Sequence, residues 1–220
     1  MLPDKPMNES GNGYAYRDAS LSHTFAYLHP VVAEVLDHVQ FAEGNRRIFE
    51  LGCGNGSFAD QLSRRGFEVS GVDASEQGIE FAKRHYPHLD RLELGSAYDD
   101  LAGRYGRFPV AISLEVVEHV YYPRKFAATL FSLLEDGGVA IVSTPYHGYW
   151  KNLALAVTGK LDDHFTALWD HGHIKFWSMR TLRALLEEAG FVDIEFRRAG
   201  RIPPLAKSML AIARRPRGRT

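Results

Sequence analysis

The chain has 220 residues and a formal net charge of −1, so no global electrostatic field favours nucleic acid or an anionic surface. Hydrophobic residues make up 45% and charged residues 24%, which is typical of a globular protein with one well-buried domain. The single cysteine excludes a disulfide framework, the start MLPDKPMNESGNG lacks signal-peptide features, and no run of about 18 apolar residues exists, so we expect a soluble, cytoplasmic protein.

The first part of the chain predicts an arm followed by a helix. Residues 1–13 are rich in proline, glycine, asparagine and charge, and we expect them to form a mobile arm. Pro30 is expected to open a helix, because apolar residues then recur with helical spacing on one face. The members of that face are Val31, Val32, Val35, Leu36 and Val39.

Strand and helix patterns then alternate as far as Pro145. Five segments predict strands: RRIFEL, FEVSGVD, RLELG, FPVAISL and VAIVSTP. Between them, SFADQLSRRG, SEQGIEFAKRHY and PRKFAATLFSLLEDGG predict helices. Because several strands are apolar on both faces, this alternation predicts a parallel sheet that helices cover on two sides.

The last third of the chain opens with an interruption, residues 146–177, that contains all three tryptophans. A structureless loop this long is unusual in a compact domain, so we expect a cap. SMRTLRALLEEAG then predicts a helix with Ser178 as its N-cap, and FVDIEFRRAG and SMLAIARR predict a closing pair of strands. Residues 14–215 thus form one predicted domain, and residues 216–220 a short basic tail.

Three alternating glycines, Gly52, Gly54 and Gly56, follow the first predicted strand. Glycine in a structured element costs about 0.5–1 kcal/mol, so their concentration favours a loop that approaches a ligand closely. In a parallel sheet this junction lies at the ligand-binding edge. The order is G-x-G-x-G rather than the dinucleotide fingerprint G-x-G-x-x-G. Glu50 suits an ammonium group, and Asp73 is placed to bind ribose hydroxyls and would repel the 2′-phosphate of NADP.

At these motifs the sequence resembles the class I methyltransferases that use S-adenosyl-L-methionine. ELGCGNGSFADQLSRRGFEVSGVDAS resembles their first two motifs, and ISLEVVEHVYYP and LLEDGGVAIVSTP resemble the motifs of the fourth and fifth strands. The resemblance covers about Arg46 to Arg215. It implies a three-layer Rossmann-like α/β fold with a seven-stranded, mostly parallel sheet and a reversed last strand.

The resemblance also implies which residues bind S-adenosylmethionine. The implied set is Glu50, Gly52, Cys53, Gly54, Gly56, Asp73, Ala74, Ser96, Ala97 and Glu115. In this set Asp73 binds the ribose, Ser96 and Ala97 lie at the adenine edge, and Glu115 faces the methionine portion. Many relatives have aspartate at the position of Ser96, so adenine recognition here is expected to rely on backbone amides and packing. Another departure is Pro109, because relatives usually have aspartate at the start of the fourth strand.

The reaction that the resemblance implies is an in-line methyl transfer, in which a hydroxyl acceptor must lose its proton. His119 and His173 are the candidate bases, although a structural role for His119 is equally compatible with the sequence. DHGHIKFWSMRTLRALLEEAGF is similar to the ubiquinone-pathway O-methyltransferases, which favours a small aromatic, quinol-like or other partly apolar acceptor. A sugar or lipid acceptor, or a non-catalytic module that only binds S-adenosylmethionine, stays open.

The cap carries two further expectations. Its acidic and histidine residues match no standard metal spacing, so we expect no metal; they are Asp162, Asp163, His164, His171 and His173. Its aromatic residues are expected to face the acceptor; they are Tyr146, Tyr149, Trp150, Trp169 and Trp177. The apolar run beside Lys151 and Lys160 would alternatively make a weak peripheral membrane contact, but burial in the cap is favoured.

Overall fold

The computed structural model describes residues 21–165, 167–169 and 172–218, so the predicted arm at residues 1–13 lies outside the described residues. Seven strands form one sheet in the order β3-β2-β1-β4-β5-β7-β6. Their bounds are β1 Arg47–Leu51, β2 Glu68–Asp73, β3 Leu92–Leu94, β4 Phe108–Leu114, β5 Leu134–Pro145, β6 Val192–Ala199 and β7 Ser208–Arg214. β7 pairs antiparallel with both β5 and β6, whereas the other pairs are parallel. The predicted reversed last strand is confirmed.

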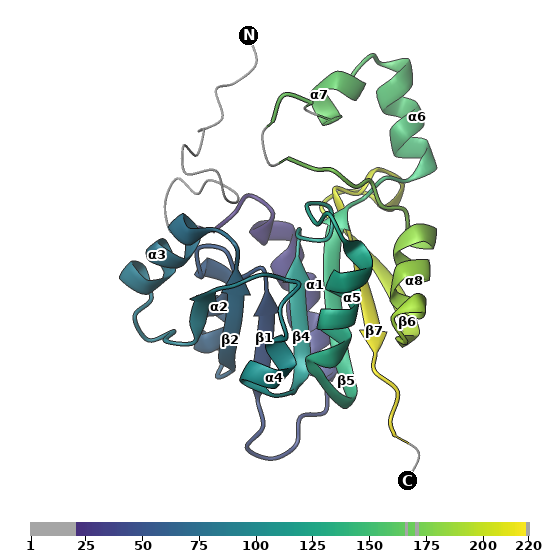
Figure 1. Ribbon diagram of the computed structural model, residues 1–220. Helices are drawn as coiled ribbons and strands as arrows, with labels where there is room; N and C mark the ends of the chain where they lie inside the picture. The colour runs from purple at the N-terminus through teal and green to yellow at the C-terminus, as the bar shows by residue number, and fades with distance from the viewer. Residues whose placement is uncertain (1–20, 166, 170–171, 219–220) are drawn as a thin grey trace.

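Helices cover both faces of this sheet (Figure 1). Side chains of successive strand residues point to the two faces in turn. α1 (Phe25–His38), α2 (Ser57–Arg64) and α3 (Glu76–His85) pack with Ile48, Val110 and Ile141. α4 (Leu101–Tyr105), α5 (Pro123–Ser132) and α8 (Met179–Glu188) pack with Phe49 and Ala111 on the opposite face. Because adjacent strand residues point to opposite faces, apolar strands of this kind can hold two separate cores.

Two predicted boundaries were wrong. α1 begins at Phe25 and contains Pro30, which removes one backbone donor near the start of the helix, while the buried Leu28, Val32 and Leu36 hold the helix on the sheet. α5 ends at Ser132, earlier than the predicted end just before the glycines, because Leu134 already pairs with Phe108 and starts β5. Local helix propensity was overridden there by strand pairing.

The cap stands beyond the carboxyl ends of the parallel strands (Figure 1). It contains α6 (Tyr149–Val157) and α7 (Leu161–Phe165), and none of their residues is buried. The return to the sheet passes through α8. Its N-cap residue is Ser178, as the sequence predicted, and Ser178 forms a capping box with Thr181. A 3₁₀ turn at Pro203–Leu205 joins β6 to β7. No helix in the described part of the chain has the length and apolarity that crossing a bilayer requires.

The first glycine of the loop after β1 is held in a conformation and a space that suit only glycine. Gly52 has a φ of +88°, and a Cβ there would overlap Cγ2 of Val116. Gly44 has a similar φ of +71° but open space around it. The two positions therefore separate the cost of backbone conformation from the cost of the steric contact.

We expect Gly52→Ala to lower the free energy of unfolding by about 2–5 kcal/mol, since left-handed backbone and overpacking both oppose it. Gly44→Ala, the matched control, should lower it by only about 1–2 kcal/mol. Urea denaturation of both variants measures the difference. Equal losses at the two positions would show that Val116 does not constrain the loop.

Candidate functional site

A cavity of about 1390 Å³ lies at the carboxyl ends of β1, β2 and β4. The sheet order places β1 and β4 side by side, although β2 and β3 lie between them in sequence. This reversal is where open α/β sheets bind ligands. The walls come from the loops after β1 to β4, from the segment before and within α1, from the cap and from the connection between β6 and β7. Typical ligand pockets measure about 300–1,000 Å³, so this cavity is larger than a typical single-ligand pocket.

All of the site residues expected from the sequence line this cavity except Gly56. Gly56 has a φ of +76°, and a Cβ there would come within 2.9 Å of the Ala82 Cβ on α3. The third glycine therefore lets α2 begin close to α3. Its position is explained by packing, whereas Gly52, Cys53 and Gly54 form cavity wall.

Asp73 ties two loops together at the floor of the cavity. Its Oδ2 accepts a hydrogen bond from the Gly54 N–H at 2.9 Å, and its Oδ1 accepts one from the Ser75 N–H at 2.8 Å. Burial raises the pKa of Asp73, and these two backbone hydrogen bonds oppose the rise. One side chain thus fixes the glycine loop and the start of α3, and its oxygens retain acceptor capacity toward the cavity.

Glu50 is a buried acid whose hydrogen bonds are incomplete. Its side chain is 3% exposed and lines the cavity, and its Oε2 has no hydrogen-bond partner among the described residues. Burial and, secondarily, the charge of Asp73 raise its pKa well above the ordinary value. An unmatched buried acceptor is costly, so this carboxyl group fits a ligand that brings a donor, such as an ammonium group.

Glu115 directly follows β4 in a strained conformation, with a φ of 56°. Its Oε1 accepts a hydrogen bond from the Ser143 hydroxyl at 2.8 Å and its Oε2 one from the Ser208 hydroxyl at 3.3 Å. Burial raises its pKa to about 7, against the lowering effects of Ser143, Ser208 and Lys151. Left-handed backbone at a non-glycine residue costs about 1–3 kcal/mol and is concentrated at functional sites. The strain here aims a titratable carboxyl group into the cavity.

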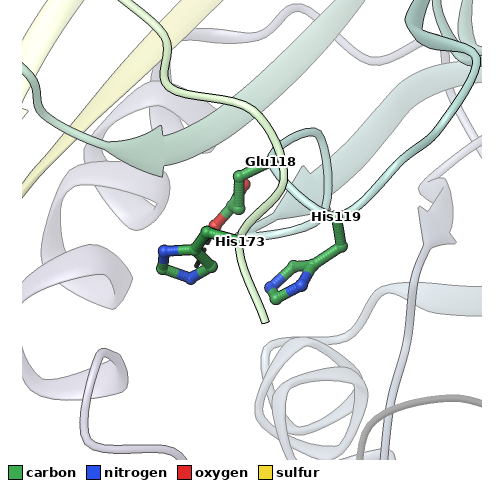
Figure 2. Close-up of side chains that lie close together, drawn as sticks. All are labelled: Glu118, His119 and His173. Carbon is green, nitrogen blue, oxygen red and sulfur yellow. Dashed lines mark ion pairs between the residues drawn. The ribbon is translucent and has the colours of Figure 1, made fainter. Parts of the chain in front are cut away.

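Three side chains converge where the loop after β4 meets the end of the cap: Glu118, His119 and His173 (Figure 2). His173 Nε2 lies 3.9 Å from Glu118 Oε1, and the two imidazole rings lie 4.8 Å apart, edge to face. His119 Nδ1 lies 3.1 Å from the Gly172 carbonyl oxygen. If that nitrogen carries the proton, the neutral ring has its basic nitrogen at Nε2. Burial, and then Glu115, raise the pKa of Glu118 well above its ordinary value.

The chemistry open to this group is proton acceptance or cation binding. One ligand atom from each of Glu118, His119 and His173 lies within 4.8 Å of the others. Imidazole nitrogen and carboxylate oxygen are ligands for several divalent metals. The sequence prediction of no metal considered only the cap, and it missed Glu118, whose pairing with His173 depends on tertiary contact. Of the cap residues considered there, His171 lies outside the described residues.

The cap contributes fewer aromatic side chains to the cavity than the sequence predicted. Of the five expected, Trp169 lines it. Trp177 is part of a core and donates a hydrogen bond from Nε1–H to the Val117 carbonyl at 3.0 Å, so this expectation was wrong for Trp177. Tyr149 and Trp150 are 73% and 65% exposed and lie outside the cavity lining.

Several lining residues carry no local signal in the sequence. They include Phe25 and Tyr27 of α1, Lys151 of α6, and Arg201 and Lys207 between β6 and β7. Each belongs to a segment far along the chain from the glycine loop, and only the fold brings these segments together.

Comparison with known proteins agrees with this geometry. A family model described as "Methyltransferase domain" matches residues 21–195. The ubiquinone biosynthesis O-methyltransferase of Caulobacter sp. (strain K31) is 41% identical over 117 residues, which are 51% of this chain and 46% of the relative. The protein of the same name from Bartonella quintana (strain Toulouse) is 32% identical over 160 residues, which are 69% and 62% of the two chains. The chain thus spans about half to three fifths of these relatives.

Solved structures of low sequence identity share the fold. A SAM-dependent methyltransferase from Archaeoglobus fulgidus superposes with a TM-score of 0.61 at 17% identity, covering 85% of this chain and 94% of its own. Magnesium protoporphyrin IX methyltransferase from Synechocystis PCC 6803, with bound SAH, gives 0.59 at 21% identity, covering 86% and 83%. The expected Rossmann-like sheet is therefore confirmed. Because the family model matches most of this chain, the chain belongs to the methyltransferase domain family.

Proposed function

We propose that the chain transfers a methyl group from S-adenosylmethionine to a hydroxyl group of a small aromatic, quinol-like or otherwise partly apolar acceptor. The observation that carries the proposal is one cavity that holds Asp73 and the unmatched Glu50 at one end and His119 and His173 at another. Support for O-methylation comes from the relatives named ubiquinone biosynthesis O-methyltransferase.

The cofactor end of the cavity offers a partner for each polar part of S-adenosylmethionine. Asp73 accepts hydrogen bonds from the ribose hydroxyls, and the Glu50 carboxylate pairs with the ammonium group. The loop backbone from Gly52 to Gly54 lies beneath the amino acid portion. Ala74, Ser96 and Ala97 border the adenine. The cofactor supplies the electrophilic methyl carbon. The chain binds and orients the cofactor and the acceptor, and it removes the proton of the acceptor hydroxyl.

The histidine end of the cavity supplies the base. His173 or His119 accepts the proton of the acceptor hydroxyl. The Glu118 carboxyl group beside His173 stabilises the resulting imidazolium. Trp169 packs edge-on to His119, with ring centroids 5.9 Å apart, and so fixes its orientation. A metal bound by the same three side chains is the competing account of this cluster.

The exposed face of α6 supports an additional, weaker contact with a membrane surface. Tyr149, Trp150 and Val157 are 73%, 65% and 79% exposed, and Leu153 lies between them in helical spacing. An amphipathic helix with aromatic residues on its apolar face can lie in the interface of a bilayer. Such a contact suits an acceptor with a lipid tail.

Asp73→Ala should weaken binding of S-adenosylmethionine and of its demethylated product about 10- to 100-fold, because hydrogen bonds to a charged group contribute about 1.5–3 kcal/mol each. Calorimetric titration measures both constants, and NAD should bind poorly. Asp37→Ala, which breaks an exposed ion pair with Arg65, is the control and should leave both constants unchanged. A dissociation constant that Asp73→Ala leaves unaltered would contradict the assignment of Asp73 as the residue that binds the ribose hydroxyls.

At least one of His119→Ala and His173→Ala should lower turnover of a catechol acceptor about 100- to 10,000-fold at saturating cofactor. Binding of the demethylated cofactor should not change, since neither histidine is assigned to it. His38→Ala, on the exposed end of α1, is the control. Turnover should also survive EDTA. Loss of activity with EDTA and recovery with added divalent metal would replace the base by a metal at the same three side chains.

The cap should close over the bound ligands, which trypsin can measure. Lys151 and Lys160 both line the cavity from the cap, so cleavage after them should slow when the demethylated cofactor and a catechol are bound. Cleavage after Arg84, at the exposed end of α3, provides the internal control. Equal rates at the cap sites with and without ligands would refute closure.

A further inference from the structure

The acidic and basic side chains that line the cavity come from different parts of the chain. The acids Glu50, Asp73 and Glu115 lie at the ends of β1, β2 and β4. Four cations line the side formed by the cap and the β6–β7 connection, where Lys151 interacts with Glu115: Lys151, Lys160, Arg201 and Lys207. Asp163 of α7 is the acid that lines this second side. The second side therefore carries an excess of positive charge.

These four cations have no acidic partner at ion-pair distance in the part of the chain that the structure describes, and the same holds for the other described lysines. Among the described residues, none of the four lies within 4.0 Å of a carboxylate oxygen, and Asp163 makes no ion pair with them. Lys207 Nζ instead lies over the ring of Tyr27, 5.1 Å from its centroid. Unpaired cations that converge on a cavity repel one another, and a bound anion would relieve this repulsion.

Lys151 is the cation that is held most firmly. Its Nζ donates a hydrogen bond to the Tyr146 carbonyl at 2.8 Å and lies 3.5 Å from the Lys207 carbonyl oxygen. Burial and then the charge of Arg201 lower its pKa to about 8, while Glu115 acts in the opposite direction. Lys151 therefore stands between the two sides of the cavity, with neutral carbonyls as its hydrogen-bond partners.

We propose that the methyl acceptor carries an ionised carboxylate or phosphate group, which Lys151, Arg201 and Lys207 bind. This inference rests on the proposed function and narrows its substrate class to acidic hydroxyl compounds. The acids at the strand ends repel the ionised group, so the charge pattern orients the acceptor with its acidic group toward the cap. A lipid headgroup fits less well, because Lys151 is half-buried inside the cavity, apart from the exposed apolar face of α6.

Calorimetry with three probes tests this on the complex with the demethylated cofactor. The probes are 3,4-dihydroxybenzoate, its neutral methyl ester and phenyl phosphate, and the last separates phosphate from carboxylate preference. At least one anionic probe should bind about tenfold or more tightly than the ester. Lys151→Met should lower anion affinity about 10- to 100-fold, and the more exposed Arg201→Met about three- to tenfold, with ester and cofactor binding unchanged. Arg180→Met, an exposed arginine of α8 outside the cavity lining, is the matched control.

Ester binding as tight as anion binding in the parent protein would overturn the inference, as would variants that weaken ester and anion equally. If the variants instead lose binding to phosphatidylglycerol vesicles while the ratio of anion to ester affinity is unchanged, the cations serve a lipid surface and the inference is wrong. Should Lys151→Met not fold, Arg201→Glu, at an exposed position, carries the test and should remove the preference for anions. The same titrations are repeated without cofactor, so that acceptor binding is judged separately from cofactor binding. Failure of the cofactor to bind would count against the proposed function alone.

Discussion

The geometry of the site depends on the hydrogen bonds that the Asp73 carboxylate accepts. This carboxylate accepts one backbone hydrogen bond from the glycine loop and one from the start of α3, so the ends of β1 and β2 are fixed relative to each other. The loop can approach Asp73 because Gly52 and Gly54 take left-handed backbone, with φ values of 88° and 54°. A buried carboxylate that is satisfied in this way stays ionised more readily than one that is merely desolvated, which is the situation of Glu50.

A second constraint joins the cap to this rigid floor. The backbone carbonyl of Glu118 accepts hydrogen bonds from the N–H groups of Ile174 and Lys175, at 2.9 and 3.0 Å. Trp177 adds the hydrogen bond to Val117, so the segment that leaves the cap is tied to the loop after β4. These contacts are made by backbone and by one buried indole. They explain why His173 reaches His119 although the two residues are far apart in sequence.

The sheet, and the position of the glycine loop and Asp73 at the edge of the cavity, could be predicted from the sequence because their signals are local. The glycine order, Asp73 at the end of a strand and the alternation of strands with helices all lie within short segments, and the structure places them as expected. Pro30 and the Leu134 boundary were misjudged because tertiary burial and strand pairing override local propensity there. The positions of Glu118 beside His173 and of Arg201 and Lys207 in the cavity wall could not be predicted, since they depend on segments that meet only in the folded chain. The prediction that the aromatic residues of the cap face the acceptor failed in part for a related reason, because composition does not show which side of a helix faces a cavity.

Two acids whose pKa values are raised, Glu115 and Glu118, interact with each other at or beside the cavity. Glu115 combines left-handed backbone with a pKa near 7, and Glu118 is fully buried nearby with its pKa raised in part by Glu115. When two carboxyl groups disfavour each other's ionisation, a positive group that lies between or beside them is electrostatically favourable. Here those groups are His173 beside Glu118 and Lys151 near Glu115. A proton or cation entering this region is therefore stabilised by the same acids whose burial is costly in its absence, which couples the stability of the folded site to occupation by its ligands.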